Sequence, residues 1–188
     1  IFTDGLEMTG LMDTLKITRF LYGSRYARTR FTILAVPDTL YQQNGINSVE
    51  ELINTYTDEP DSITQIQNGF YRYMEYHCLG GTYYLSHLEE KLYPILSYDN
   101  NIAITLENDY EINMNSETDE YTSFLKEESN IPAKNGVIHT INGLLPVTTP
   151  EPMTIIFEVT DFFDFEQGDY FRNQQYAKFS DGQNTFEK

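Results

Sequence analysis

Histidine, cysteine and carboxylate side chains are the groups in this sequence that could bind a metal or move protons. Zinc requires His or Cys ligands at characteristic spacings. His77 and Cys78 are adjacent and would diverge on a helix, and neither His87 nor His139 lies at a ligand spacing from them. The acidic residues of the tail lack the spacing and the turn glycine of an EF-hand calcium loop: Asp161, Asp164, Glu166 and Asp169. We therefore predict neither a metal site nor another cofactor.

The sequence also lacks the short motifs that accompany common catalytic sites. It has no glycine-rich phosphate loop and no Gly-x-Ser-x-Gly nucleophile motif. Its Ser, His and Asp residues have no spacing that singles out a catalytic triad. We expect the protein not to be an enzyme, since a hydrolase would require a deep pocket with a pair of carboxylates.

The net charge of −17, from 12 basic and 29 acidic residues, opposes binding to phosphate backbones. We therefore expect no nucleic-acid partner. Four arginines lie close together early in the chain, and we expect them to pair with nearby carboxylates rather than to form an anion site: Arg19, Arg25, Arg28 and Arg30. No apolar run approaches the ~20 residues that span a bilayer, so we expect no membrane-spanning segment.

Hydrophobic periodicity and capping signals predict the elements that would position these groups. Asp4 and Glu7 resemble a capping box before apolar residues at helical spacing, which predicts one helix at the start of the chain. The apolar, β-branched run at residues 31–36 predicts a buried strand. Pro37 and Asp38 would end this strand in a turn.

Two further capping boxes predict helices in the middle of the chain. Ser48 and Glu51 would begin a short helix, and Ser62 and Gln65 a longer one that Gly80–Gly81 ends. Apolar and aromatic residues recur along the longer helix at a spacing of three or four: Ile63, Ile66, Phe70, Tyr73, Met74 and His77. This stripe would face the core, and it would bury His77.

Residues 134–146 predict a turn that leads into a central strand. Asn135-Gly136 favours positive φ and a tight turn, and Val137, His139 and Ile141 would then share one buried face of the strand. Earlier, residues 102–106 and 110–114 alternate between apolar and polar around Asn108-Asp109. That pattern predicts a β-hairpin with one buried face.

Three blocks, in this order, resemble the motifs of the fasciclin domain. They are Phe31-Thr32-Ile33-Leu34-Ala35-Val36-Pro37-Asp38, Tyr76-His77, and Asn135-Gly136-Val137-Ile138-His139-Thr140-Ile141 with Leu144-Leu145-Pro146. The resemblance covers residues 3–147, about three quarters of the chain. It departs from the family pattern at Pro37, which is displaced by one position, and at Asn142, where the family often has Asp.

The resemblance implies an α+β fold in which two small β-sheets pack as a wedge, with helices on one side. It implies a non-catalytic adhesion or binding module, often found in tandem, with a protein or glycan partner at the cell surface. The single cysteine excludes an internal disulfide and no glycosylation sequon is present, so we expect a bacterial cell-envelope protein, either an outer-membrane lipoprotein or secreted. The motif residues are implied to be structural: Phe31, Thr32, Ala35, Pro37, Asp38, Asn135, Gly136 and His139.

The Tyr76-His77 pair has two interpretations. The Tyr-His region of animal fasciclin proteins is associated with receptor binding, so the resemblance makes both residues candidates for partner contact. The helical stripe instead places His77 in the core, and we favour this structural role for His77 and for His139. Buried neutral imidazoles would make the fold less stable as the pH falls below ~6.5.

An alternative function is a carbohydrate-binding module, in which exposed members of the 15 Tyr and 12 Phe residues stack on sugars beside acidic hydrogen-bond acceptors. A flat exposed row of aromatic rings bordered by Asp would favour glycan binding. Buried aromatic residues would favour a surface for protein contact.

Composition divides the chain into a fasciclin-like domain at residues 1–147 and a remainder at residues 148–188. The remainder consists of a proline-containing linker, a strand predicted at residues 153–159, and an aromatic, acidic tail. The tail either packs back on the domain or begins a further module, and we favour the second. Since the chain opens with Ile1, we expect it to derive from a longer precursor.

Overall fold

This computed structural model describes residues 1–96, 100–106, 110–115, 120–145, 178–180 and 185–187. The chain divides into two compact units, Ile1–Thr149 and Pro150–Lys188. Within the second unit, β11 (Lys178–Ser180) and β12 (Thr185–Glu187) pair antiparallel. The strand predicted at residues 153–159, the acidic tail residues and the turn at Asn108-Asp109 lie outside the described residues. A further module at residues 148–188 stays a prediction.

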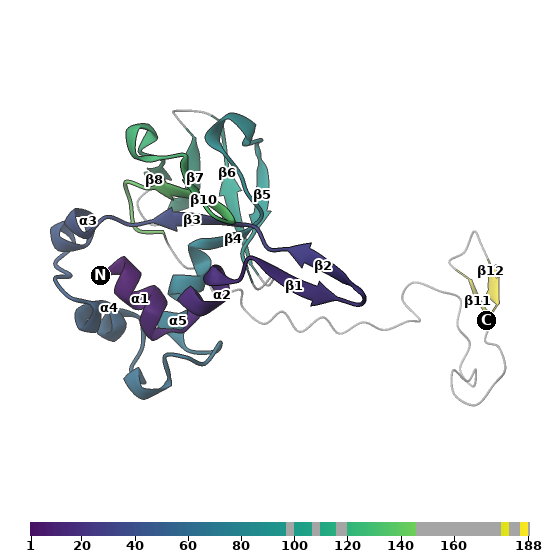
Figure 1. Ribbon diagram of the computed structural model, residues 1–188, viewed down its shortest axis with the longest axis horizontal. Coiled ribbons are helices and arrows are strands. Elements are labelled where there is room, and N and C mark those ends of the chain that lie inside the picture. Colours follow the sequence, from purple (N-terminus) through teal and green to yellow (C-terminus); the bar gives the residue numbers. More distant parts are fainter. Residues whose placement is uncertain (97–99, 107–109, 116–119, 146–177, 181–184, 188) are drawn as a thin grey trace. The chain divides into compact units, whose positions relative to one another are not determined.

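The first unit consists of short helices and two four-stranded sheets, with a separate hairpin (Figure 1). Its helices are α1 (Phe2–Met8), α2 (Leu11–Lys16), α3 (Asp38–Gln43), α4 (Val49–Tyr56) and α5 (Gly69–Tyr76), with 3-10 turns η1 (Pro60–Ser62), η2 (Leu85–His87) and η4 (Lys126–Glu128). Its strands are β1 (Arg19–Tyr22), β2 (Arg25–Arg28), β3 (Phe31–Ala35), β4 (Cys78–Gly80), β5 (Lys91–Pro94), β6 (Asn101–Ile104), β7 (Glu111–Asn115), β8 (Glu120–Ser123), β9 (Ile131–Ala133) and β10 (Gly136–Thr140). These elements confirm the α+β class.

The central sheet has the strand order β4-β3-β10-β9 and joins segments that are far apart in sequence. β10 pairs parallel with β3, in a register that places His139 opposite Leu34, while β4 and β9 pair antiparallel at the two edges. The Leu34 N–H donates to the His77 carbonyl oxygen at 2.9 Å. The early strand, the end of the middle helix and the late strand therefore meet in one interior, as the sequence motifs predict.

The second sheet is a meander with the order β5-β6-β7-β8. Ile104 of β6 pairs with Ile112 of β7, which confirms the predicted hairpin. In Figure 1 the helices α1, α2, α4 and α5 lie on one side of β3, and this second sheet lies on the other. Isolated bridges join the two sheets, between Leu79 and Ile95 and between Phe124 and Ile141.

Several predicted helix boundaries are wrong. The opening helix begins at Phe2, so Asp4 lies inside its first turn and makes no side-chain cap. Gly10 separates α1 from α2, so the single predicted helix is in fact two helices. Its φ of 79° is left-handed and cannot continue a right-handed helix, and glycine adopts it more easily than residues with a side chain. Asp38 was predicted to lie in a turn after the strand, but it is the first residue of α3.

The helix predicted to begin at Ser62 is also shorter than expected. It begins at Gly69, and the Asn68 side chain caps it by accepting hydrogen bonds from two backbone N–H groups. Ser62 ends the 3-10 turn η1 instead of capping a helix, and Ile66 is exposed. The capping box at Ser48 is confirmed, since its hydroxyl accepts a hydrogen bond from the Glu51 N–H at 3.2 Å.

The predicted Asn-Gly turn has a different geometry. Lys134 and Asn135 form the two-residue turn between β9 and β10, and Gly136 is already the first residue of the strand. Gly136 is not among the residues with positive φ. Glycine is required because a Cβ at this position would lie 2.0 Å from the Phe31 carbonyl oxygen. Its role is therefore close backbone approach within the sheet.

Candidate functional site

The Tyr76-His77 pair lies inside the first unit and not at its surface. Tyr76 is 2% exposed and His77 is fully buried. The Tyr76 hydroxyl donates to the Asn101 carbonyl oxygen at 3.2 Å and accepts from the Asn113 side-chain amide at 2.6 Å. These contacts hold the end of α5 against the second sheet. Neither ring is available to a partner in this structure, and the role in partner contact stays a prediction.

His77 is packed between aromatic rings at the C-terminal end of α5. Its ring centroid lies 5.5 Å from that of Phe2 and 4.7 Å from that of Tyr73. The Nδ1–H donates to the Tyr73 carbonyl oxygen at 2.8 Å, whereas Nε2 has no hydrogen-bond partner among the described residues. Removal from water lowers the pKa of His77 to about 4. His77 is therefore neutral near pH 7.

His139 is also fully buried, and both of its ring nitrogens have partners. Nε2 lies 2.8 Å from the Tyr83 carbonyl oxygen, and Nδ1 lies 3.1 Å from the Asn130 backbone N–H. Since Nδ1 must accept from that N–H, the proton is on Nε2, which donates to Tyr83. Burial lowers the pKa of His139. The ring bridges two loops to β10, which is a structural role.

The other motif residues also stabilise the junction of β3, β10 and the loops. The Thr32 hydroxyl donates to the Gly81 carbonyl oxygen at 3.0 Å and accepts from the Tyr83 N–H at 2.9 Å. The Asn135 side-chain amide donates to the carbonyl oxygens of Leu15 at 2.9 Å and Ile17 at 2.7 Å. Phe31 is buried in the sheet, and the Ala35 carbonyl oxygen accepts a hydrogen bond from the Ile141 N–H. The Pro37 carbonyl oxygen accepts the first backbone hydrogen bonds of α3.

The sequence interpretation missed the hairpin formed by β1 and β2. In Figure 1 this hairpin projects from the first unit. Its strands pair from Arg19 with Arg28 to Tyr22 with Arg25, and Gly23 has a φ of 61° in the two-residue turn. The Gly-Ser dipeptide between two aromatic runs is a hairpin signal that could have revealed it.

The hairpin presents large apolar side chains to solvent. Tyr22 is 76% exposed, Tyr26 68%, Leu21 63% and Phe20 47%. The Arg19 guanidinium lies over the Tyr26 ring, 5.0 Å from its centroid. Large exposed apolar side chains grouped on one projecting element mark a surface for binding.

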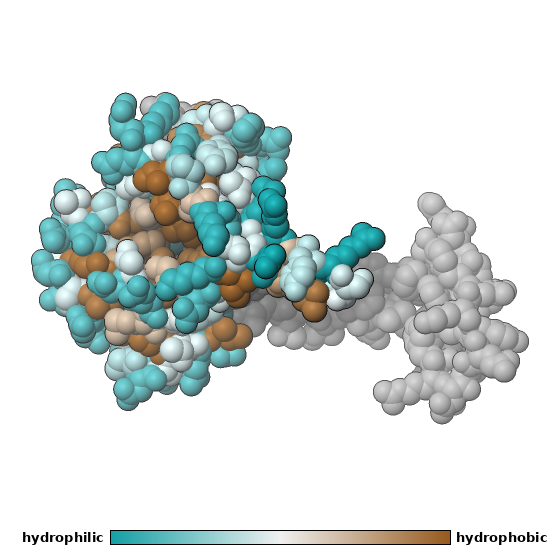
Figure 2. Space-filling model, viewed as in Figure 1, coloured by the Kyte–Doolittle hydropathy of each residue, from teal (hydrophilic) through white to brown (hydrophobic). Residues whose placement is uncertain are grey.

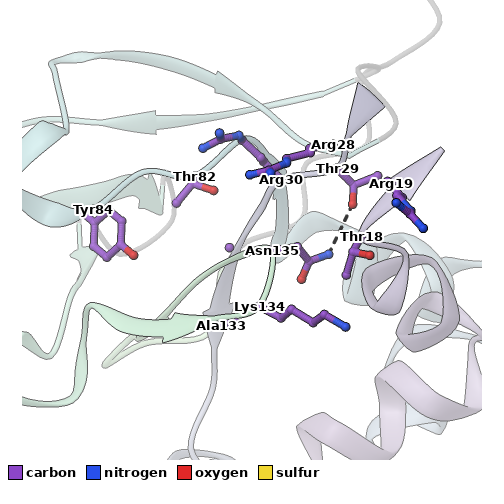
Figure 3. Close-up of a pocket in the computed structure, with 11 residues that line it drawn as sticks. Thr18, Arg19, Arg28, Thr29, Arg30, Thr82, Tyr84, Ala133, Lys134 and Asn135 are labelled. Carbon is purple, nitrogen blue, oxygen red and sulfur yellow. Dashed lines mark hydrogen bonds between the residues drawn. The ribbon is translucent and has the colours of Figure 1, made fainter. Parts of the chain in front are cut away.

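A basic pocket of about 600 Å³ lies at the base of this hairpin (Figure 3). We define it by its four cationic side chains, Arg19, Arg28, Arg30 and Lys134, with Thr82 and Tyr84 on its wall. In Figure 3, Arg28 and Arg30 extend toward Thr82, and Arg19 and Lys134 extend to the other side of Asn135. No carboxylate forms an ion pair with any of these four side chains in the described part of the chain. The predicted pairing of Arg19, Arg28 and Arg30 with carboxylates is therefore not found among the described residues.

An apolar groove of about 690 Å³ adjoins the basic pocket. β3 and β10 contribute Ile33, Ala35 and Ile138 to it, and α1 and α2 contribute Leu6 and Met12. Figure 2 shows a hollowed patch of apolar residues in the same area, between β3 and the helices below it. The groove exists because the short helices leave these three sheet residues only half-buried.

Groups that could hold a metal do not gather in the described residues. No cluster of three or more His, Cys, Asp or Glu side chains occurs there. Cys78 is a free, fully buried thiol whose Sγ lies 3.6 Å from the Met74 carbonyl oxygen, and burial raises its pKa. Among the helices described, none has the length and apolarity to cross a membrane.

Solved structures include proteins that are similar to this chain. The chain is similar to a FAS1 domain pair from the insect cell adhesion molecule fasciclin I. The two share 16% identity with a TM-score of 0.48, over 76% of this chain and 45% of that structure. The chain spans less than half of the matched structure. No model of a protein family matches the chain. No curated protein matches it significantly.

Proposed function

We propose that this chain is a non-catalytic binding module of the fasciclin type that contacts another protein at the cell surface through the β1–β2 hairpin. The observation that carries the proposal is the exposure of Phe20, Leu21, Tyr22 and Tyr26 on one projecting element. A two-stranded hairpin gains little stability from exposed aromatic rings, so these side chains are better explained by contact with a partner.

The residue types on the hairpin match those of protein interfaces. Tyr and Arg are enriched at the energetic centres of such interfaces, and the hairpin combines Tyr22 and Tyr26 with Arg19, Arg25 and Arg28. The arginines border the rings, whereas the glycan alternative predicts a flat aromatic row bordered by Asp. The hairpin therefore favours a protein partner over a glycan.

The proposed place of action is the cell envelope, as an outer-membrane lipoprotein or a secreted protein, and the module would be one of several in a longer chain. Support comes from the three fasciclin-like sequence blocks, which converge in the central sheet of this chain. Sequencing the precursor gene upstream of Ile1 tests the location, because a lipoprotein signal would support it. A precursor without any export signal would contradict it.

A binding screen with matched variants tests the hairpin. The full chain is applied to arrays of surface proteins and of glycans, and each interaction is then measured for Leu21→Ser and Tyr22→Ser. Both substitutions should weaken protein binding by about ten-fold or more, as truncation of central interface residues does. Ile66→Ser is the control, because Ile66 is also exposed but lies outside the hairpin.

Three results would overturn the proposal. Binding that survives both hairpin substitutions would place the contact surface elsewhere. A chain that binds glycans and no protein, with loss of binding in Tyr22→Ser, would establish the carbohydrate alternative. Turnover of a substrate by the purified chain would contradict the non-catalytic role.

A further inference from the structure

The basic pocket concentrates positive charge on a strongly acidic protein. The chain has a net charge of −17, yet four of its 12 basic residues line this one pocket. Between Asp13 and Asp38 the sequence contains no acidic residue, whereas it contains several basic ones: Lys16, Arg19, Arg25, Arg28 and Arg30. None of the described residues that line the pocket is acidic either. The positive charge is therefore not neutralised from within the hairpin or from the wall of the pocket.

Arg28 and Arg30 form the part of the pocket that faces Thr82. In Figure 3 both side chains extend toward Thr82, on one side of Asn135. Neither guanidinium forms an ion pair in the described part of the chain, and like charges held close together repel. An anion between them would relieve this repulsion and would accept charge-assisted hydrogen bonds from both groups.

Hydrogen bonds to the segment around the start of β3 hold Thr82 in place. The Gly81 N–H donates to the Arg30 carbonyl oxygen at 2.8 Å, and the Tyr83 N–H donates to the Thr32 hydroxyl at 2.9 Å. Thr82 lies between these two anchored residues and lines the pocket. Its backbone is therefore positioned beside Arg30 before any ligand arrives, which lowers the entropic cost of binding.

Thr82 and Tyr84 add neutral donors to the charged ones. Both side chains are half-buried and line the pocket. Neither hydroxyl has a hydrogen-bond partner among the described residues, so each can donate to a ligand. Guanidinium groups match the geometry of phosphoryl oxygens, and a hydroxyl beside them supplies one more donor. The part of the pocket around Thr82 therefore suits a phosphoryl group.

The remainder of the pocket is large and polar. Its volume of about 600 Å³ lies in the range of small-molecule sites, usually about 300–1,000 Å³, and exceeds what a single oxyanion fills. Apart from Ala133 and Gly136, each described lining residue has a polar or charged side chain. The body of a ligand that fills this space should therefore carry hydroxyl groups rather than an alkyl chain, because buried polar groups need hydrogen-bond partners.

We propose that the basic pocket binds a small phosphate monoester with a hydroxylated body, as in a sugar phosphate. Its phosphoryl group lies between Arg28 and Arg30 and accepts a hydrogen bond from the Thr82 hydroxyl, while its body lies against Tyr84. A phosphate monoester carries about two negative charges above pH 7, which matches two guanidinium groups. The exposed aromatic residues of the hairpin do not line this pocket, so the site does not depend on the proposed protein contact.

A matched series of ligands tests the proposal on the full chain. Glucose 6-phosphate carries both parts of the proposed ligand, glucose 6-sulfate has the same body with one charge fewer, and inorganic phosphate lacks the body. Calorimetric titration at pH 8 should show glucose 6-phosphate binding about ten-fold more tightly than the sulfate and at least about three-fold more tightly than inorganic phosphate. Affinity for glucose 6-phosphate equal to that for either of the others would overturn the proposal, as would no binding.

Two variants test the contacts to the phosphoryl group. Arg28→Gln with Arg30→Gln should weaken glucose 6-phosphate binding by about ten-fold or more and remove the preference over the sulfate. Thr82→Val keeps a β-branched side chain without the hydroxyl and should weaken binding by about three-fold or more. If the double variant does not fold, Arg28→Gln alone replaces it, because Arg28 is exposed. Unchanged affinity in these folded variants would overturn the proposal.

Controls in the hairpin separate the pocket from net charge and from the protein contact. Arg25→Gln removes one charge from the same hairpin but outside the pocket, so it should leave the affinity for glucose 6-phosphate within about two-fold. Equal losses in Arg25→Gln and Arg28→Gln would reduce the effect to net charge and overturn the proposal. Leu21→Ser, which removes the proposed protein contact, should also leave this affinity unchanged. Failure of the protein contact and failure of the phosphate site are therefore distinguishable.

A lipid head group and an acidic protein segment are the competing occupants of the pocket. Phosphatidylcholine vesicles with phosphatidic acid present a phosphate monoester on a membrane, and a polyaspartate peptide presents carboxylates along a chain. Glucose 6-phosphate that displaces the protein from either competitor supports the small-molecule site. Binding to the vesicles or to the peptide that glucose 6-phosphate does not displace, and that Arg28→Gln weakens, would assign the pocket to that competitor and overturn the proposal.

Discussion

The central strand β3 and the hairpin strand β1 are both short, apolar and bordered by arginine, but they have opposite surroundings. β3 lies between β4 and β10, and its Leu34 is fully buried. β1 pairs only with β2, and all four of its residues are exposed. The difference shows that neighbouring strands, rather than the residues of a strand, decide whether apolar side chains stabilise the fold or remain available for binding.

The comparison predicts that substitutions in the sheet affect stability much more than those in the hairpin. Gly136→Ala should have the largest effect, because its Cβ would lie 2.0 Å from the Phe31 carbonyl oxygen. We expect the free energy of unfolding to fall by about 3 kcal/mol or more. Chemical denaturation measures this change.

Gly23→Ala is the matched control in the hairpin. Gly23 has a φ of 61° and open space around it, so alanine would meet only conformational strain, about 1 kcal/mol. An equal loss of stability in both variants would contradict the distinction between close approach and positive φ.

Acid should destabilise the fold through the buried imidazoles. The pKa of His77 is lowered to about 4, against ~6.5 when unfolded, so the unfolded chain takes up the proton first. The contribution of His77 is complete above pH ~6.5 and is lost as the pH falls toward 4, by up to about 3 kcal/mol. The pKa of His139 is also lowered, so this residue adds to the loss in the same direction.

Unfolding midpoints at pH 8 and pH 5 check this prediction. His139→Gln should show a smaller difference between the two midpoints than the wild type. His87→Gln is the control, because His87 is exposed and should leave the difference unchanged. Equal midpoints at both pH values for the wild type would contradict the role of the imidazoles.

Asn135→Ala should have an intermediate effect. The substitution removes the amide that donates to the carbonyl oxygens of Leu15 and Ile17, at the point where the N-terminal helices meet the turn before β10. We expect a loss of about 1 to 2 kcal/mol in the free energy of unfolding, measured by urea denaturation. Asn135→Asp keeps the size of the side chain but removes its amide donors. If this variant were as stable as the wild type, the two hydrogen bonds would contribute little to stability.

Tyr22→Ser should have the smallest effect on stability. Tyr22 is 76% exposed at the end of β1, so its removal should change the free energy of unfolding by no more than about 0.5 kcal/mol. The same variant should lose partner binding. A large loss of stability would show that the aromatic residues of the hairpin support the fold.

The sequence allowed prediction where local patterns carry the information. The burial of Val137, His139 and Ile141 followed from alternation, and the cap at Ser48 from its capping box. The β6–β7 hairpin was predictable because its strands are close in sequence. These features depend on contacts within a few residues.

Features that depend on distant contacts could not be predicted in this way. The parallel pairing of β10 with β3 joins residues about a hundred positions apart, so no local signal specifies it. Ser62 had the residues of a cap, but Asn68 caps α5 because its side chain also binds Thr57, Glu59 and Ser62. The basic pocket was missed for a related reason, since Lys134 joins the arginines only after folding.

The buried thiol of Cys78 can report how often the edge of the central sheet opens locally. Cys78 belongs to β4 and pairs with Ile33, so a thiol-reactive dye can modify it only when this edge of the sheet separates. Because the chain has one cysteine, the labelling rate reports a single event without an engineered probe.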